Sequence, residues 1–185
     1  MKGMNKLGKT VTKILEVFHW VGAALMVAAT VCSVAAPDWL KYFVGYDSKD
    51  CCGATVNVYG FEVTAPVADG AMDMKAFLLF GIGATIILAL MAMVFRNLHL
   101  IFKKSENTTP FQEDNVRMMR EIGIFSCAVP FIGLFMSAIF RWVNGGGAGE
   151  ISMSLSGLWI GIIMLCMSQF FAHGVALEED VDGLV

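Results

Sequence analysis

Charged residues are scarce in this chain of 185 residues, making up only 16% of the sequence. A soluble domain averages about a quarter charged residues, and this chain is instead 57% hydrophobic. The deficit argues against an ordinary soluble domain and favours a membrane protein. A net charge of −3, with Lys and Arg in small groups, also excludes a broad basic face that binds nucleic acid directly.

Proline is scarce as well, with four residues, and the five cysteines form no CxxC pair. A chain this apolar and this poor in proline does not have the composition of a disordered protein. The cysteine spacing predicts no metal site. The sequence also lacks a nucleophile–base–acid set and a glycine-rich phosphate loop before a helix. We therefore expect neither an enzyme nor a bound cofactor.

Long apolar runs are what the sequence does contain. A spanning helix needs about 20 mostly apolar residues, and four segments qualify: 14–36, 76–102, 122–143 and 151–177. Residues 1–185 are therefore expected to form one all-α membrane domain of four transmembrane helices. The basic residues before the first segment would also suit a cleaved signal peptide. That apolar run is too long for one, however, and Glu16 and His19 stand at its start.

The Lys and Arg residues are divided unevenly between the two sides of this layout. Nine of the 13 fall in the amino-terminal tail and around the loop after the second segment, and four fall on the other side. Since loops on the cytoplasmic side carry the excess of Lys and Arg, we expect both termini in the cytoplasm. The expected location is a cytoplasmic membrane.

The first outer loop, residues 37–75, contains the stretch TVNVYGFEVTAPV. Its alternation around a Tyr-Gly pair predicts a small β-hairpin. The same loop holds the adjacent pair Cys51 and Cys52, and Cys32 lies near the outer end of the first span. In an oxidising compartment Cys51 or Cys52 would form a disulfide with Cys32, with each other or with a partner, or would stay reduced. These alternatives stay open at the level of sequence.

The loop between the second and third spans carries a helix-start pattern. Thr109 is predicted as the N-cap, Pro110 as the first helical residue and Gln112 as the capping-box residue. The helix is expected to begin at Pro110 and to run unbroken into the third span. We expect this segment to contact a cytoplasmic partner through Thr109, Pro110, Phe111, Gln112, Asn115, Arg117 and Arg120.

Two stretches carry a resemblance to a known family. They are TPF-x-x-x-NV-x-x-MR-x-IG, from Thr109 to Gly123, and FFAHGVALEEDVDGLV, from Phe170 to Val185. With four spans and a larger first outer loop, the chain resembles the YoaS-like family of bacterial membrane proteins, domain of unknown function twenty-nine seventy-five. Members are often encoded beside a small helix-turn-helix repressor-like protein, so the resemblance implies a membrane partner or sensor for such a regulator. His173 departs from the family pattern, in which Arg or Lys is frequent.

Ionisable residues inside membrane spans are costly and are therefore candidates for function. The members of a predicted polar cluster share a position in the cytoplasmic third of their helices: Glu16, His19, His99, Gln169 and His173. One interpretation is a ligand, proton or metal site. The other is hydrogen bonding between helices and snorkelling near helix ends.

The carboxy-terminal tail is acidic, through Glu178, Glu179, Asp180 and Asp182. It is either a solvated end or a docking point for a basic partner. The layout favours a regulatory or sensory membrane protein, and the resemblance implies that it acts with a helix-turn-helix regulator. The alternatives are a small transporter or channel, or an immunity protein against membrane-active compounds. A GxxxG at Gly157 and Gly161 leaves open tight packing within the chain or a homo-oligomer.

Overall fold

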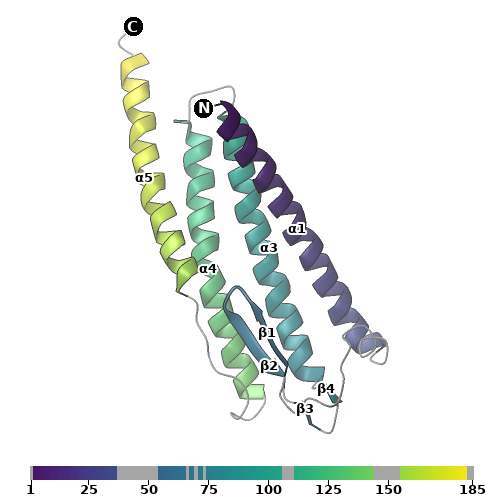
Figure 1. Cartoon of the computed structure of the whole chain (residues 1–185). Coiled ribbons are helices and arrows are strands. Elements are labelled where there is room, and N and C mark those ends of the chain that lie inside the picture. Colours follow the sequence, from purple (N-terminus) through teal and green to yellow (C-terminus); the bar gives the residue numbers. More distant parts are fainter. Residues whose placement is uncertain are drawn as a thin grey trace. The chain divides into compact units, whose positions relative to one another are not determined.

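The computed structural model of this chain describes residues 2–36, 54–65, 67–68, 71–72, 74–105, 111–143 and 155–182. The helices within these residues are α1 (Lys2–Ala35), α3 (Met74–Lys104), α4 (Glu113–Val143) and α5 (Ser156–Asp182), shown in Figure 1. The strands are β1 (Ala54–Val58), β2 (Phe61–Ala65), β3 (Val67–Ala68) and β4 (Ala71–Met72).

All four of these helices are long and apolar enough to cross a membrane. The qualifying segments are Asn5–Ala35, Phe77–Lys104, Glu113–Val143 and Ser156–Glu178. The prediction of four spanning helices is thus confirmed by length and composition, and the chain has the helices of a multi-pass membrane protein.

The helix boundaries differ from the predicted ones. Helix α1 begins at Lys2, before the apolar run, and α5 begins at Ser156 rather than at residue 151. The predicted start of the third helix at Pro110, with Thr109 as N-cap, is wrong, because α4 begins at Glu113. The carbonyl of Gln112 accepts hydrogen bonds from the amides of Asn115 (2.9 Å) and Val116 (3.1 Å), which puts Gln112 at the N-cap. Thr109 and Pro110 themselves lie outside the described residues.

The chain forms two compact units, and we describe each by itself. Unit 1 comprises Met1–His19, Leu90–Ala128 and Leu155–Val185. Unit 2 comprises Trp20–Ala89 and Val129–Ser154. Helices α1, α3 and α4 each contribute one part to unit 1 and the other part to unit 2, whereas α5 belongs to unit 1.

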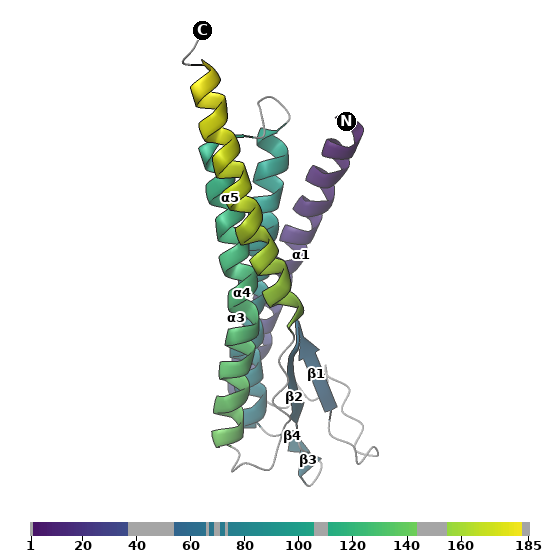
Figure 2. The same cartoon turned by 90° about the vertical axis from the view of Figure 1, so that its left-hand side faces the viewer.

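In unit 2, strands β1 and β2 form an antiparallel ribbon (Figure 2), with Val58 opposite Phe61. Tyr59 and Gly60 make the turn, and both have positive φ, 51° and 85°. This is the backbone of a two-residue hairpin turn whose twist matches that of the strands. The amide of Gly60 donates to the Oδ1 of Asn57 at 3.0 Å, which closes the turn. Strands β3 and β4 form a second, two-residue antiparallel pair.

One aromatic residue fastens this hairpin to the helices of unit 2. Phe61, at 1% exposure, is among the most deeply buried side chains. Its ring stacks on that of Phe80 in α3, with centroids 5.5 Å apart. Gly83 makes room for the ring, because a Cβ there would lie 2.7 Å from it, and Gly133 also faces Phe61, at a distance where a Cβ would make an ordinary contact of 3.5 Å.

Several hydroxyl side chains within the helices donate to carbonyls of their own helix, although the buried hydroxyl of Ser137 has no hydrogen-bond partner among the described residues. Thr12 donates to Gly8, Thr30 to Met26 and Ser168 to Leu165, each at 2.7 Å. Lipid offers no hydrogen-bonding partner, so a polar group in a spanning helix must be satisfied within the protein. These hydroxyls therefore sit in an apolar environment without needing a water-filled path beside them.

In unit 1, α5 lies alongside the first part of α4 (Figures 1 and 2). Glycines allow the close approach, since a Cβ at Gly123 would lie 2.7 Å from the Cγ of Leu165 and 3.0 Å from the carbonyl oxygen of Gly161. Small residues are what let membrane helices pack backbone to backbone. The second glycine of the GxxxG pair, Gly161, is thus buried within the chain against α4.

Candidate functional site

The α1 and α3 members of the predicted polar cluster lie in unit 1. Glu16 and His19 are both buried on α1, at 8% and 4% exposure. Glu16 accepts from the Nζ of Lys13 at 3.0 Å, and that lysine side chain is half exposed. The carboxylate is therefore paired within its own helix, close to water, which lowers the cost of burying it.

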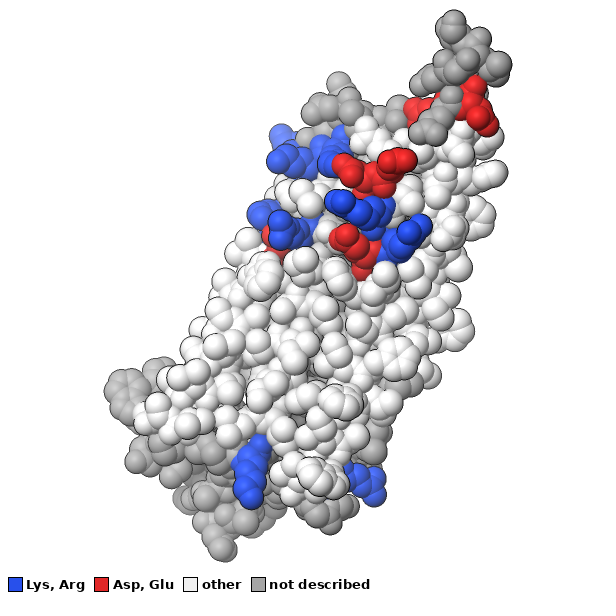
Figure 3. Space-filling view, turned by 180° about the vertical axis from the view of Figure 1, so that it is seen from behind, with Lys and Arg blue, Asp and Glu red and all other residues white. Residues whose placement is uncertain are grey.

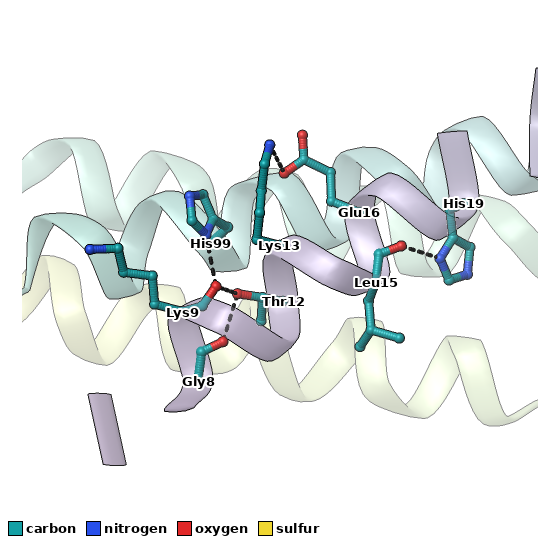
Figure 4. Close-up of polar contacts among 8 residues, drawn as sticks. All are labelled: Gly8, Lys9, Thr12, Lys13, Leu15, Glu16, His19 and His99. Atoms are coloured by element: carbon teal, nitrogen blue, oxygen red, sulfur yellow. Dashed lines mark hydrogen bonds and ion pairs between the residues drawn. The ribbon is translucent and has the colours of Figure 1, made fainter. Parts of the chain in front are cut away.

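Both histidines on these helices donate to backbone carbonyls (Figure 4). The Nδ1 of His19 donates to the carbonyl of Leu15 at 2.7 Å, and the Nδ1 of His99 reaches from α3 to the carbonyl of Lys9 in α1 at 3.0 Å. A carbonyl oxygen only accepts, so the Nδ1 of each ring carries a proton. The ring of His19 also packs on Phe95 of α3, with centroids 4.9 Å apart. The His99–Lys9 hydrogen bond and the His19–Phe95 contact join α1 to α3, whereas the His19–Leu15 hydrogen bond lies within α1.

The α5 members of the cluster are placed differently. Gln169 and His173 are both exposed on α5. His19 and His99 make separate contacts between α1 and α3, one at Phe95 and the other at the carbonyl of Lys9, and the two α5 residues lie on the surface of unit 1, so the described residues do not form the single predicted cluster. Among the described residues, no three His, Cys, Asp or Glu side chains are grouped so that they could hold a metal ion.

Sequence reasoning missed a polar contact between α3 and α4. The Nδ2 of Asn97, which is 4% exposed, donates to the Oε2 of Glu121 at 2.9 Å. The other oxygen of Glu121 lies 3.7 Å from the Nε of Arg117, one turn earlier on α4. A buried amide inside a span was the available indication, because such a group needs a partner on another helix.

The segment before α4 is held against α5 by an aromatic side chain. The ring of Phe111 packs on that of Phe171, with centroids 5.4 Å apart. It also covers Gly174, where a Cβ would lie 2.5 Å from the Cδ1 of Phe111. This contact joins two segments that are distant in the sequence, the entry to α4 and the last part of α5. It also gives a reason for the late start of α4, because residue 111 serves the contact with α5 instead of a first helical turn.

A second polar contact fixes the end of α3 to the start of α4. Lys104, in the last turn of α3, forms an ion pair and hydrogen bond with Asp114 in the first turn of α4. Asp114 and Glu113 stand at the positive end of the α4 dipole, and Lys103 and Lys104 stand at the negative end of the α3 dipole. In Figure 3, a space-filling view from behind, Lys and Arg side chains lie next to Asp and Glu side chains.

A pocket of about 400 Å³ opens between the first turns of α4 and the last part of α5. Its charged wall comes from α4, and its floor is apolar. The lining residues are Glu113, Val116, Arg117, Arg120, Ala172, Val175 and Ala176. The structure therefore puts two residues of the predicted partner segment, Arg117 and Arg120, on the rim of one cavity. Asn115, of the same segment, is buried instead.

The acidic tail is the continuation of α5, which stays helical to Asp182. In Figures 1 and 2 its last turns extend beyond the start of α4. Asp180 is exposed, as are Leu177 and Val181, at 55% and 61%. Residues 177 and 181 are four apart and share a helix face, so the end of α5 presents an apolar stripe among carboxylates.

The predicted disulfide concerns residues that the structure only partly describes. Cys32 is exposed on α1, close to the end of that helix. Cys51 and Cys52 lie outside the described residues, so the pairing remains a prediction. No protein-family model, no curated protein and no solved structure matches this chain.

Proposed function

We propose that this chain is a regulatory or sensory protein of the bacterial cytoplasmic membrane, and that its cytoplasmic end binds a small helix-turn-helix regulator. The uneven division of Lys and Arg supports an orientation with both termini inside. In that orientation the charged end of unit 1 faces the cytoplasm. The hairpin β1–β2 faces outward and is the part available to an envelope signal.

The observation that carries the proposal is the end of α5. Four of its last five residues, from Glu178 to Asp182, are acidic, and its last turn has no basic residue. Carboxylates at the negative end of a helix dipole are unfavourable, so a basic partner would stabilise this end. The exposed pair Leu177 and Val181 adds an apolar stripe of the kind that a partner helix covers.

The kind of partner follows from the resemblance to the YoaS-like family, which implies a neighbouring helix-turn-helix protein. A DNA-binding protein of that kind carries a basic surface, and its charge is complementary to the α5 end. The contact of Phe111 with Gly174 supports a single binding surface for the partner, because it joins the two stretches on which the resemblance depends. Hydroxyls that bond their own helices favour this function over transport through a polar path.

Site-specific photo-crosslinking in native membranes tests the proposal. A photoreactive residue at Val181 is expected to give an adduct with a small, basic, soluble protein that carries a helix-turn-helix, identified by mass spectrometry. The matched control puts the same residue at Trp159, which is exposed on the same helix but in its apolar part. The proposal fails if position 181 gives no adduct, or only the adducts that position 159 gives.

The orientation has its own test in a cysteine-free background. Asp180→Cys should react with a membrane-impermeant maleimide only after the cells are opened. Tyr59→Cys, in the hairpin turn, should react in intact cells. The reverse pattern would place the α5 end outside and would exclude a cytoplasmic regulator as its partner.

A further inference from the structure

The proposed binding of a partner at the end of α5 assigns no role to the pocket between α4 and α5. Two of its lining residues, Arg117 and Arg120, are three apart on α4 and therefore project from neighbouring positions of one helix face. The Arg117 side chain is 71% exposed. Guanidinium groups bind phosphate through two parallel hydrogen bonds, and a pair of them forms a phosphate site.

The pocket lies at the level expected for the membrane–water interface. Arg120 precedes the apolar run that begins at Ile122 by two residues, roughly 3 Å along the helix axis. Ile124 follows Arg120 by one turn on the same face and is 52% exposed. An acyl chain that leaves the pocket therefore has an apolar surface to follow. Basic pockets between transmembrane helices are known sites for phospholipid headgroups.

The rim also carries a carboxylate, and this restricts the class of ligand that the pocket can bind. Glu113 lines the pocket one turn before Arg117, and Glu121 offsets part of the Arg117 charge at 3.7 Å. The two guanidinium groups are balanced by the carboxylates of Glu113 and Glu121, and the neighbouring Asp114 is paired with Lys104, so these groups together carry no net formal charge. A headgroup with only a negative charge would leave Glu113 without a counter-charge, whereas a zwitterionic headgroup offers it an ammonium group.

We propose that this pocket binds an ammonium-bearing phospholipid of the phosphatidylethanolamine type. Its phosphate lies at Arg117 and Arg120, its ammonium group at Glu113, and its glycerol on the apolar floor made by Val116, Ala172 and Val175. The acyl chains pass Ile124 into the bilayer. The assignment needs only a membrane surface at this end of unit 1, on either side of the membrane, and does not depend on the proposed regulator.

Native mass spectrometry of the full-length protein in detergent tests the site. Phosphatidylethanolamine and phosphatidylglycerol with identical acyl chains are the probes, and the wild type is expected to bind the first about tenfold more tightly. Arg120→Gln should weaken the binding of both lipids about tenfold. Arg120→Lys keeps the positive charge but lacks the planar guanidinium group, so it should weaken binding less. Glu113→Gln should remove the preference between the lipids. Arg141→Gln, which changes an exposed arginine at the far end of α4, is the matched control and should change nothing.

Two results overturn the proposal. One is equal binding of the two lipids to the wild type together with unchanged binding to Arg120→Gln. The other is equally tight binding of glycerophosphoethanolamine, which has the headgroup but no acyl chains, because this would make the pocket a site for a water-soluble phosphate ester. Thermal unfolding of each variant without added lipid establishes that the compared proteins are folded.

Discussion

Phe111 lies directly over Gly174, so that a Cβ at position 174 would fall 2.5 Å from the Cδ1 of the ring. The contact holds the entry to α4 on the last part of α5, beside the pocket that Arg117 and Arg120 line. It therefore determines the geometry of the lipid site and links the start of α4 to the helix that ends in the acidic tail.

Gly174→Ala should destabilise the protein, because the added methyl group displaces the Phe111 ring. Overpacking of this kind costs about 1–3 kcal/mol, and the better helix propensity of alanine offsets up to about 1 kcal/mol of it. Phe111→Ala should relieve the clash, so that Gly174→Ala costs less in that background than in the wild type. A double-mutant cycle from thermal unfolding in detergent measures the difference. Additive effects of the two substitutions would mean that the contact is absent.

Phe61→Ala should release the hairpin from the helices of unit 2. The ring fills a site bounded by Phe80 and Gly83, and removing a buried phenylalanine costs about 3–5 kcal/mol. Hydrogen exchange of the β1 and β2 amides should rise. Trp142→Ala removes a larger ring that is 84% exposed and is the control, with little expected change. Equal exchange in the two variants would contradict the anchoring role of Phe61.

Asn97→Ala should destabilise the contact of α3 with α4 by about 1–3 kcal/mol, since it leaves a Glu121 oxygen without its 2.9 Å donor. Glu121→Gln is the matched variant. It keeps a side-chain oxygen for Asn97, now as a neutral and weaker acceptor, and loses the exposed ion pair with Arg117, and exposed pairs contribute about 0–1 kcal/mol. If the glutamine variant proved as unstable as Asn97→Ala, the ion pair rather than the amide contact would be the stabilising element.

The sequence is sufficient to predict the four helices, because each contains an apolar run long enough to span a bilayer. Their ends depend on contacts between distant segments. Helix α1 extends back to Lys2, where Gly8 lies against Phe102 and the Lys9 carbonyl receives His99. Such tertiary contacts produce no periodic apolar pattern in the amino-terminal residues, so the sequence does not predict that the helix begins there.

The sequence predicted two arginines of the pocket as functional residues, but not the pocket itself. Arg117 and Arg120 could be assigned to a partner segment from their position after a helix-start pattern. The pocket, however, needs α5 as its other wall. The pairing of α4 with α5 depends on Gly123 and Gly161, and a GxxxG spacing does not say whether its partner helix is in the same chain.

The most direct test of the proposed function is the affinity of the purified regulator, once it is identified by crosslinking at Val181, for the full-length protein in nanodiscs. The comparison is with the variant E178Q/E179Q/D180N/D182N and with the control D47N/D50N/D69N/D73N, which removes as many charges from the predicted outer loop. We expect at least a tenfold loss of affinity for the first variant and none for the control. We also expect weaker wild-type binding at higher salt, because the charges at the end of α5 would be screened. Equal affinity of both variants and the wild type would contradict the assignment of the α5 end as the docking site.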